Sequence, residues 1–143
     1  MINTILAIDT SADDTSASVT RKQVVLSNCI WSQVELHKEW GGIVPSIAKR
    51  AHAEHLPKTI DRAIRESGCG WNEIDAVAVT IGPGLSIALE VGVAEAKRLA
   101  LTHNKPLMPV NHMEGHLYSA FAVSKQRASQ PNFVPPTPAF PLL

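Results

Sequence analysis

Short runs of apolar residues, several of them alternating with polar residues, predict the β-strands of this chain. The run "TILAID", Thr4 to Asp9, is typical of a buried strand that ends on an acid at its C-terminal edge. "SASVT", "RK" and "QVVLSNCIWSQV" follow and predict a hairpin that continues into a longer strand. Further along, "IDAVAVT" and "PLMPV" predict two more strands.

A helical spacing of apolar residues begins at Pro45, and proline suits the first turn of a helix. Pro57 interrupts this pattern, so we expect it to kink the helix or to start a second one. Gly68 and Gly70 are expected to end the helical segment.

Two later segments are also predicted to be helical. The first runs from about Ile87 to Thr102, where Glu95 and Arg98 are expected to form an ion pair between neighbouring turns. The second runs from Met113 to Val123. The segment after it, from Pro131 to Leu143, carries five prolines and is predicted to lack regular structure for most of its length.

The predicted order is strand, hairpin strands, helix, strand, helix, strand, helix. This order favours an α/β fold with a mixed sheet and flanking helices. A ribonuclease-H-like lobe fits it better than a Rossmann fold, which would begin with a strand followed directly by a helix. A chain of 143 residues is the size of one ordinary domain.

Composition limits the possible functions. Apolar residues make up 45% and charged residues 18%, as in globular proteins, and 13 basic residues balance 13 acidic ones. A neutral balance gives no electrostatic argument for free-standing nucleic-acid binding, although a shared or local RNA surface stays open. The N-terminus lacks a basic region before its short apolar run, and the segment Ile74 to Leu101 is broken by charges. We therefore expect a cytoplasmic protein without a membrane span, with Cys29 and Cys69 reduced.

The loop after the first strand gathers acids and hydroxyls. Asp9, Asp13 and Asp14 lie close together in sequence, with Ser11 among them. Such a set suits a phosphate held through a hydrated magnesium ion. An acidic, solvated turn with side chains that cap the backbone explains the pattern equally well.

The "IGPGLS" turn also has two interpretations. Gly82 and Gly84 follow a buried strand and precede a helix, where a bare backbone approaches an anion easily. The segment is neither a GxGxxG motif nor a P-loop, and a tight turn from strand to helix is the simpler interpretation.

The stretch "HMEGH" places His112 and His116 one helical turn apart, so that both side chains can reach one metal ion. In the zinc peptidase motif H-E-x-x-H the glutamate follows the first histidine directly, whereas Glu114 comes one position later. This weakens a peptidase interpretation. Two histidines also leave a metal site one protein ligand short. For the other histidines we favour structural roles: His37, His52, His55 and His103.

Four stretches, taken together and in order, resemble the N-terminal half of the TsaD-type tRNA threonylcarbamoyladenosine synthases, a family long described as O-sialoglycoprotein endopeptidases. The resemblance covers about residues 4–123 and implies an actin-like ATPase fold of two ribonuclease-H-like lobes with the active site between them. The stretches are "ILAIDTSADDTSASV", "SQVELHKEWGGIVPSIAKRAHAEHLP", "IDAVAVTIGPGLSIALEVGV" and "PVNHMEGHLYSAF".

The resemblance implies transfer of a threonylcarbamoyl group from threonylcarbamoyl-adenylate to the exocyclic amine of an adenosine next to the tRNA anticodon. It implies one divalent metal, iron or zinc, and either threonylcarbamoyl-adenylate or ATP with magnesium as the nucleotide ligand. The implied partners are tRNA, TsaB-like and TsaE-like proteins, or the equivalent subunits of the archaeal and eukaryotic complexes. The implied residues are His112 and His116 as metal ligands, Asp13 and Asp14 as catalytic residues, and Asp9, Ser11, Gly82 and Gly84 at the nucleotide.

Among the catalytic candidates, we assign removal of the proton from the attacking amine to Asp14. The sequence also departs from the family pattern. Asp14 stands where the family has a glutamate, Asn111 where a further histidine is common, and Glu90 in a helix that is normally apolar. Ser46 and Lys49 replace a glutamate and a serine.

The resemblance also predicts how the chain is organised. Residues 1–125 are expected to form the N-terminal lobe and residues 126–143 a proline-rich linker that leads into an absent second lobe. A third metal ligand, an aspartate, belongs to the C-terminal half of the family. We therefore expect this lobe by itself to be inactive.

Three alternative functions stay open. A TsaB-type, non-catalytic assembly module would have the same fold, but such proteins lack the paired histidines. A metallopeptidase is suggested by the former family name. A sugar-kinase-like phosphotransferase would be compatible with the acidic loop, whereas the histidine pair favours the transferase.

Overall fold

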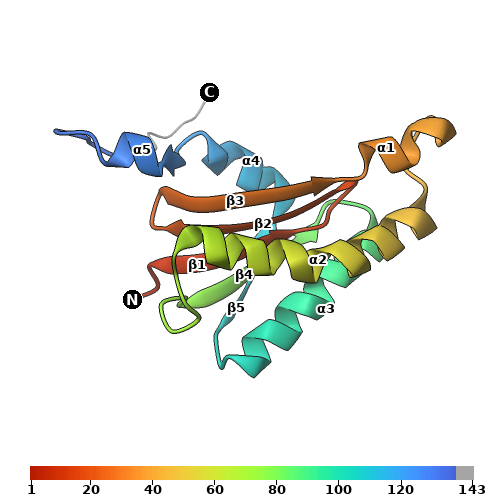
Figure 1. The fold of residues 1–143 in the computed structure, drawn as a ribbon, viewed down its shortest axis with the longest axis horizontal. Coiled ribbons are helices and arrows are strands. Elements are labelled where there is room, and N and C mark those ends of the chain that lie inside the picture. Colours follow the sequence, from red (N-terminus) through yellow and green to blue (C-terminus); the bar gives the residue numbers. More distant parts are fainter. Residues whose placement is uncertain (138–143) are drawn as a thin grey trace.

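A computed structural model describes residues 1–137 and has a six-stranded mixed sheet at its centre, with helices packed against it (Figure 1). Its elements are β1 (Thr4–Asp9), β2 (Asp14–Arg21), β3 (Val24–Ser32), α1 (Val34–His37), the 3-10 helix η1 (Lys38–Trp40), α2 (Pro45–Ser67), β4 (Ala76–Gly82), α3 (Ser86–Thr102), β5 (Leu107–Asn111), α4 (His112–Ser119), β6 (Val123–Ser124) and α5 (Lys125–Ala128).

The strands lie in the order β5-β4-β1-β2-β3-β6. β1, β2 and β3 form an antiparallel meander, while β4 runs parallel to β1 and β5 parallel to β4. β6 pairs in parallel with β3, so the sheet is mixed, as the predicted order of elements favoured. The C-terminal ends of β1, β4 and β5 therefore meet at one edge of the sheet, the edge at which parallel sheets commonly bind ligands.

The core lies between one face of the sheet and the helices α2 and α3 (Figure 1). Side chains of a strand point alternately to its two faces, and every second residue of β1 and β2 is buried against these helices. The largest apolar residues of this core are Leu6, Ile8, Val19, Leu56, Ile60, Ile74, Val77, Val79 and Leu99. The other face of the sheet carries smaller and more polar side chains, and α4 lies over part of it.

Helix α2 runs through Pro57 as one helix, so of the two expected outcomes, a kink or a second helix, no second helix begins there. Proline removes one backbone hydrogen bond, but the helix packs against the sheet on both sides of it through buried Ala51, Leu56 and Ile60. That packing holds the segment together as one helix. Gly68 ends it with a left-handed backbone (φ 76°), as predicted.

The prediction of one helix from Met113 to Val123 is wrong at its C-terminal end. Helix α4 ends at Ser119, and Val123 instead enters β6, which pairs with the free edge of β3. There the Val123 backbone N–H donates to the Gln23 carbonyl oxygen (2.8 Å) and the side chain is buried. Burial and strand pairing thus outweigh the local helical pattern. The linker predicted from residue 126 begins inside α5, and residues 138–143 of that linker lie outside the described residues.

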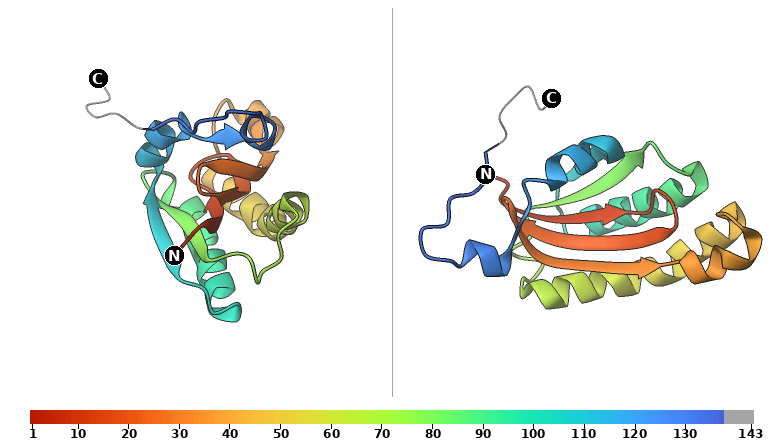
Figure 2. Two further views of the ribbon diagram at one scale, coloured as in Figure 1. Left: turned by 90° about the vertical axis from the view of Figure 1, so that its left-hand side faces the viewer. Right: turned by 90° about the horizontal axis from the view of Figure 1, so that it is seen from above.

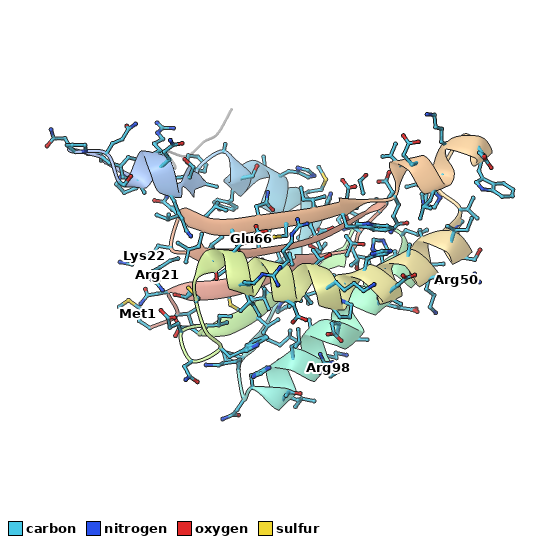
Figure 3. The ribbon with its side chains drawn as sticks, viewed as in Figure 1. Met1, Arg21, Lys22, Arg50, Glu66 and Arg98 are labelled. Carbon is cyan, nitrogen blue, oxygen red and sulfur yellow. The ribbon has the colours of Figure 1, made fainter. Side chains whose placement is uncertain are left out.

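Charged side chains lie mostly on the outer surfaces of the helices, as Figure 3 shows for Arg50 and Arg98. The Arg98 guanidinium forms the predicted ion pair with Glu95 (2.7 Å). At the opposite end of the molecule from the start of β1, α1 and η1 project beyond the sheet (Figure 2). Among residues 1–137, no helix has the length and apolar character needed to span a bilayer.

Candidate active site

Asp9 ends β1 at the ligand-binding edge of the sheet and accepts hydrogen bonds on both carboxylate oxygens. One oxygen accepts from the backbone N–H (2.8 Å) and hydroxyl (2.6 Å) of Ser11. The other accepts from the Thr80 hydroxyl of β4 and lies 3.0 Å from the His112 Nδ1. Burial raises the pKa of Asp9, but the hydrogen bonds from Ser11, Thr80 and His112 outweigh burial and bring this pKa below its ordinary value. Asp9 is therefore a carboxylate at neutral pH.

His112 and His116 lie on one face of α4. The helix begins directly after β5, where the Asn111 side chain caps it by accepting hydrogen bonds from the backbone N–H groups of Met113 and Glu114. The cap thus gives Asn111 a structural role at the start of the helix. It also fixes the start of the helix, and hence the position of His112, at the edge of the sheet.

The three side chains Asp9, His112 and His116 form a line. Because the Asp9 carboxylate only accepts, His112 donates to it from Nδ1, and Nε2 is the ring nitrogen that faces His116. The Nε2 atom of His116 lies 2.9 Å from that Nε2. Tetrahedral metal–nitrogen bonds of about 2.0–2.1 Å place two ligand nitrogens about 3.3 Å apart, so a small shift of the two rings from this hydrogen-bond distance lets both bind one metal ion. A carboxylate behind a ligating histidine is the common supporting arrangement. The described residues contain no cluster of three or more His, Cys, Asp or Glu side chains that would complete such a site.

A cavity of about 630 Å³ lies between this line of side chains and the acidic loop. Asp9, Ser11, Asp13 and Asp14 all line it, together with His112 and His116, so six of the predicted site residues share one hollow. Asp14 is exposed and Asp13 is half-buried. The cavity continues over the open face of the sheet along uncharged polar side chains: Ser16, Ser18, Asn28 and Ser119.

The two glycines of the "IGPGLS" turn do not line this cavity. At Gly84, a Cβ atom would lie 2.6 Å from the Ser11 carbonyl oxygen, so the missing side chain lets the turn pack against the acidic loop. The Leu85 backbone N–H donates to that same carbonyl (2.7 Å). Gly82 has φ 151°, a backbone conformation that favours glycine, with open space around it. The missing side chain at Gly84 thus lets the turn contact the acidic loop closely.

His52, for which the sequence favoured only a structural role, also lies in this region. It is fully buried, with its Nε2 atom 2.9 Å from the Ala12 carbonyl oxygen and its Nδ1 atom 2.7 Å from the Thr15 hydroxyl. Its position on the buried face of a helix, two turns after Pro45, was the only local signal. The partners of His52 lie 37 and 40 positions away in sequence, so no spacing pattern could reveal them.

The other three histidines have structural contacts, as favoured from the sequence. His37 is buried and bonds to the Gln33 side chain. His55 stacks on Trp31 (centroids 3.5 Å apart), and His103 stacks on Trp71 (3.7 Å).

Comparison with known proteins identifies the family of this chain. The sequence profile of the TsaD family, tRNA N6-adenosine threonylcarbamoyltransferase, matches residues 24–137. The chain belongs to the TsaD family. The tRNA N6-adenosine threonylcarbamoyltransferase of Thermosynechococcus vestitus is 48% identical over 132 residues, which are 92% of this chain, and that of a Synechocystis strain is 45% identical over the same length.

Each of those two cyanobacterial relatives is covered over only 36% of its own length. Among solved structures, YeaZ from Pseudomonas aeruginosa has a similar fold, with a TM-score of 0.63 and 22% identity over 81% of this chain and 48% of that one. This likeness confirms the predicted ribonuclease-H-like, actin-like fold class. This member of the TsaD family therefore spans about a third of the length of those two relatives. The two-histidine site and the open face of the sheet both lie in that segment.

Proposed function

We propose that this chain supplies the N-terminal half of the active site of a tRNA N6-adenosine threonylcarbamoyltransferase. The observation that carries the proposal is the line of Asp9, His112 and His116 facing two further carboxylates across one cavity. Family membership and the identity to named transferases support the reaction class. Because tRNA is the substrate, we place the protein in the cytoplasm.

In this proposal His112 and His116 hold a divalent metal, iron or zinc, through their Nε2 atoms. When bound, such an ion polarises carbonyl and phosphoryl oxygens and stabilises the negative charge that develops on them. Asp9 keeps the Nδ1 proton of His112 in place, so that the Nε2 lone pair faces the cavity. The donor set fits the ion, although the described residues supply only two ligands.

The transfer itself joins the adenosine amine to the carbamoyl carbon and releases adenylate. As nitrogen bonds to carbon, the amine loses a proton, and an exposed carboxylate on the cavity wall is able to accept it. Asp14 is the carboxylate that we assign to this step, and Asp13 lies beside it on the same wall. Ser11 and the neighbouring backbone bind the nucleotide in this proposal.

The metal site is tested first, on the chain by itself. Wild type and His116→Ala are titrated with Co²⁺ under anaerobic conditions, and d–d absorption reports ligation. Wild type is expected to bind one ion, and His116→Ala to bind at least tenfold more weakly. His55→Ala is the matched control, because His55 lies on α2 and stacks on Trp31. Equal binding by wild type and His116→Ala would contradict the metal assignment.

The reaction is tested in a chimaera. The 132 matching residues of the Thermosynechococcus vestitus relative are replaced by those of this chain, and threonylcarbamoyl transfer to tRNA is measured with a synthase that supplies the adenylate. We expect activity in the chimaera and its loss with His112→Ala or Asp14→Ala. Co-purification with TsaB-like and TsaE-like proteins tests the proposed partners.

A TsaB-type assembly module is the second candidate, favoured by the fold shared with YeaZ. It predicts that the chimaera is inactive in threonylcarbamoyl transfer. The paired histidines support the transferase instead.

A further inference from the structure

The acidic loop is held from the helix side of the sheet by His52 of α2. This side chain is fully buried and bonds to two residues of the loop and of the strand that follows it. Its Nε2 atom lies 2.9 Å from the Ala12 carbonyl oxygen, and its Nδ1 atom lies 2.7 Å from the Thr15 hydroxyl. No residue intervenes between these anchor points except Asp13 and Asp14.

The partners fix where the imidazole proton is. A carbonyl oxygen only accepts, so Nε2 carries the hydrogen and donates it to Ala12. The neutral ring then has a lone pair on Nδ1, and the Thr15 hydroxyl donates to it. Burial lowers the pKa of His52, against the opposing effects of the Ala12 carbonyl and of Asp9, Asp13 and Asp14. The ring is thus held neutral, with one donor and one acceptor that point to opposite ends of the carboxylate pair.

We propose that His52 is a positioning residue for Asp13 and Asp14, which clamps the backbone on both sides of the pair so that their carboxylates face the cavity. This proposal rests on the proposed function in one respect, namely that Asp13 and Asp14 are catalytic residues. The clamp itself stands on geometry.

A third contact completes the clamp. The Gln33 backbone N–H donates to the Asp13 carbonyl oxygen (2.9 Å), at the point where β3 ends. A histidine that only filled the core would find partners anywhere in its surroundings. His52 instead uses both nitrogens on the two residues that bracket the carboxylates, and Thr15 is itself fully buried. A buried hydroxyl that loses its acceptor leaves an uncompensated polar group, so the clamp resists opening.

The test separates the two hydrogen bonds by substitution. His52→Gln places an amide near the Nε2 position and keeps the bond to Ala12. His52→Asn places an amide near the Nδ1 position and keeps the bond to Thr15. His52→Phe keeps neither bond. Thr15→Val removes only the hydroxyl at nearly constant volume. His55→Gln, on the same helix and one turn further along, is the matched control.

Three NMR measurements are made on the 143-residue chain. Long-range ¹H–¹⁵N spectra report the His52 tautomer, ¹³C carboxyl signals report Asp13 and Asp14, and hydrogen exchange of the Gln33 amide reports closure of the clamp. We expect a neutral Nε2–H ring in wild type. In Thr15→Val and His52→Phe the Gln33 amide is expected to exchange about tenfold to a hundredfold faster, with shifted carboxyl signals at Asp13 and Asp14. His52→Gln and His52→Asn are expected to fall between these variants and wild type.

A protonated Nδ1 in wild type would overturn the proposal. So would Thr15→Val with wild-type Gln33 exchange and wild-type carboxyl signals, even if His52→Phe fails to fold. A general loss of stability would instead accelerate exchange throughout the core, including the amides of β4, which the clamp model leaves unchanged. None of these measurements uses threonylcarbamoyl transfer, so failure of the transferase assignment and failure of the clamp are told apart.

Discussion

The most informative single substitution is Asp9→Asn, because it keeps the shape of the side chain and changes only what its atoms donate and accept. The Asp9 carboxylate accepts four hydrogen bonds, two from Ser11 and one each from Thr80 and His112. Asparagine has one oxygen and one NH₂ group, and that NH₂ faces two groups that donate to the carboxylate in wild type. Those two bonds are lost or must reverse direction, and the bonds to the remaining oxygen lose their charge assistance.

The magnitude follows from the geometry. A hydrogen bond to a charged group contributes about 1.5–3 kcal/mol, and the Asp9 side chain is 28% exposed, so solvent replaces part of the loss. We expect Asp9→Asn to lower the free energy of unfolding by about 2–4 kcal/mol. This shifts a urea midpoint by about 1–2 M for a domain of this size. Co²⁺ affinity is expected to fall about 10- to 100-fold, because His112 loses the partner that orients it.

Urea denaturation followed by circular dichroism gives the first quantity, and Co²⁺ absorption titration gives the second. Asp61→Asn is the control, since Asp61 is an exposed acid on α2, away from the cavity. If Asp9→Asn unfolds at the wild-type midpoint and binds Co²⁺ with wild-type affinity, the view that Asp9 organises the site is wrong.

Three further predictions concern the surrounding structure. Gly84→Ala is expected to lower the free energy of unfolding by about 2–4 kcal/mol, because the new Cβ meets the Ser11 carbonyl oxygen at 2.6 Å. The same urea assay measures it, with Gly70→Ala as the control because Gly70 has open space around it. The pKa of His52 is lower in the folded protein than in the unfolded protein, where it is about 6.5. The free energy of unfolding is therefore expected to be highest above pH 6.5 and to decline as the pH falls below that value, because the unfolded state then binds a proton more readily. His52→Gln should remove that component of the pH dependence, and an unchanged slope would contradict it. Pro57→Ala is expected to raise the thermal midpoint and add about 1–3 kcal/mol of stability, since it restores a helical N–H within α2; a lower midpoint would show that proline is required there.

Local patterns predicted most of the elements and much of the site. The apolar run "TILAID", which ends on an acid, identified β1 and placed Asp9 at its C-terminal end. The spacing of His112 and His116 identified one helical face, and their Nε2 atoms lie 2.9 Å apart. Where the prediction failed, at Val123, the local helical pattern competed with the free edge of β3, which no local pattern reveals.

Sequence alone therefore determined most of the elements, the acidic loop and the histidine pair, since each depends on residues within a few positions of one another. Only the tertiary structure decided which of these residues act on each other. Asp9 meets His112 across 103 positions because β1, β4 and β5 end at the same edge of the sheet. His52 reaches the acidic loop because α2 packs beneath β2, and Gly84 serves that same loop through its missing side chain. Hydrogen bonds require donors and acceptors within about 3 Å, and such distances are set by strand order and helix packing.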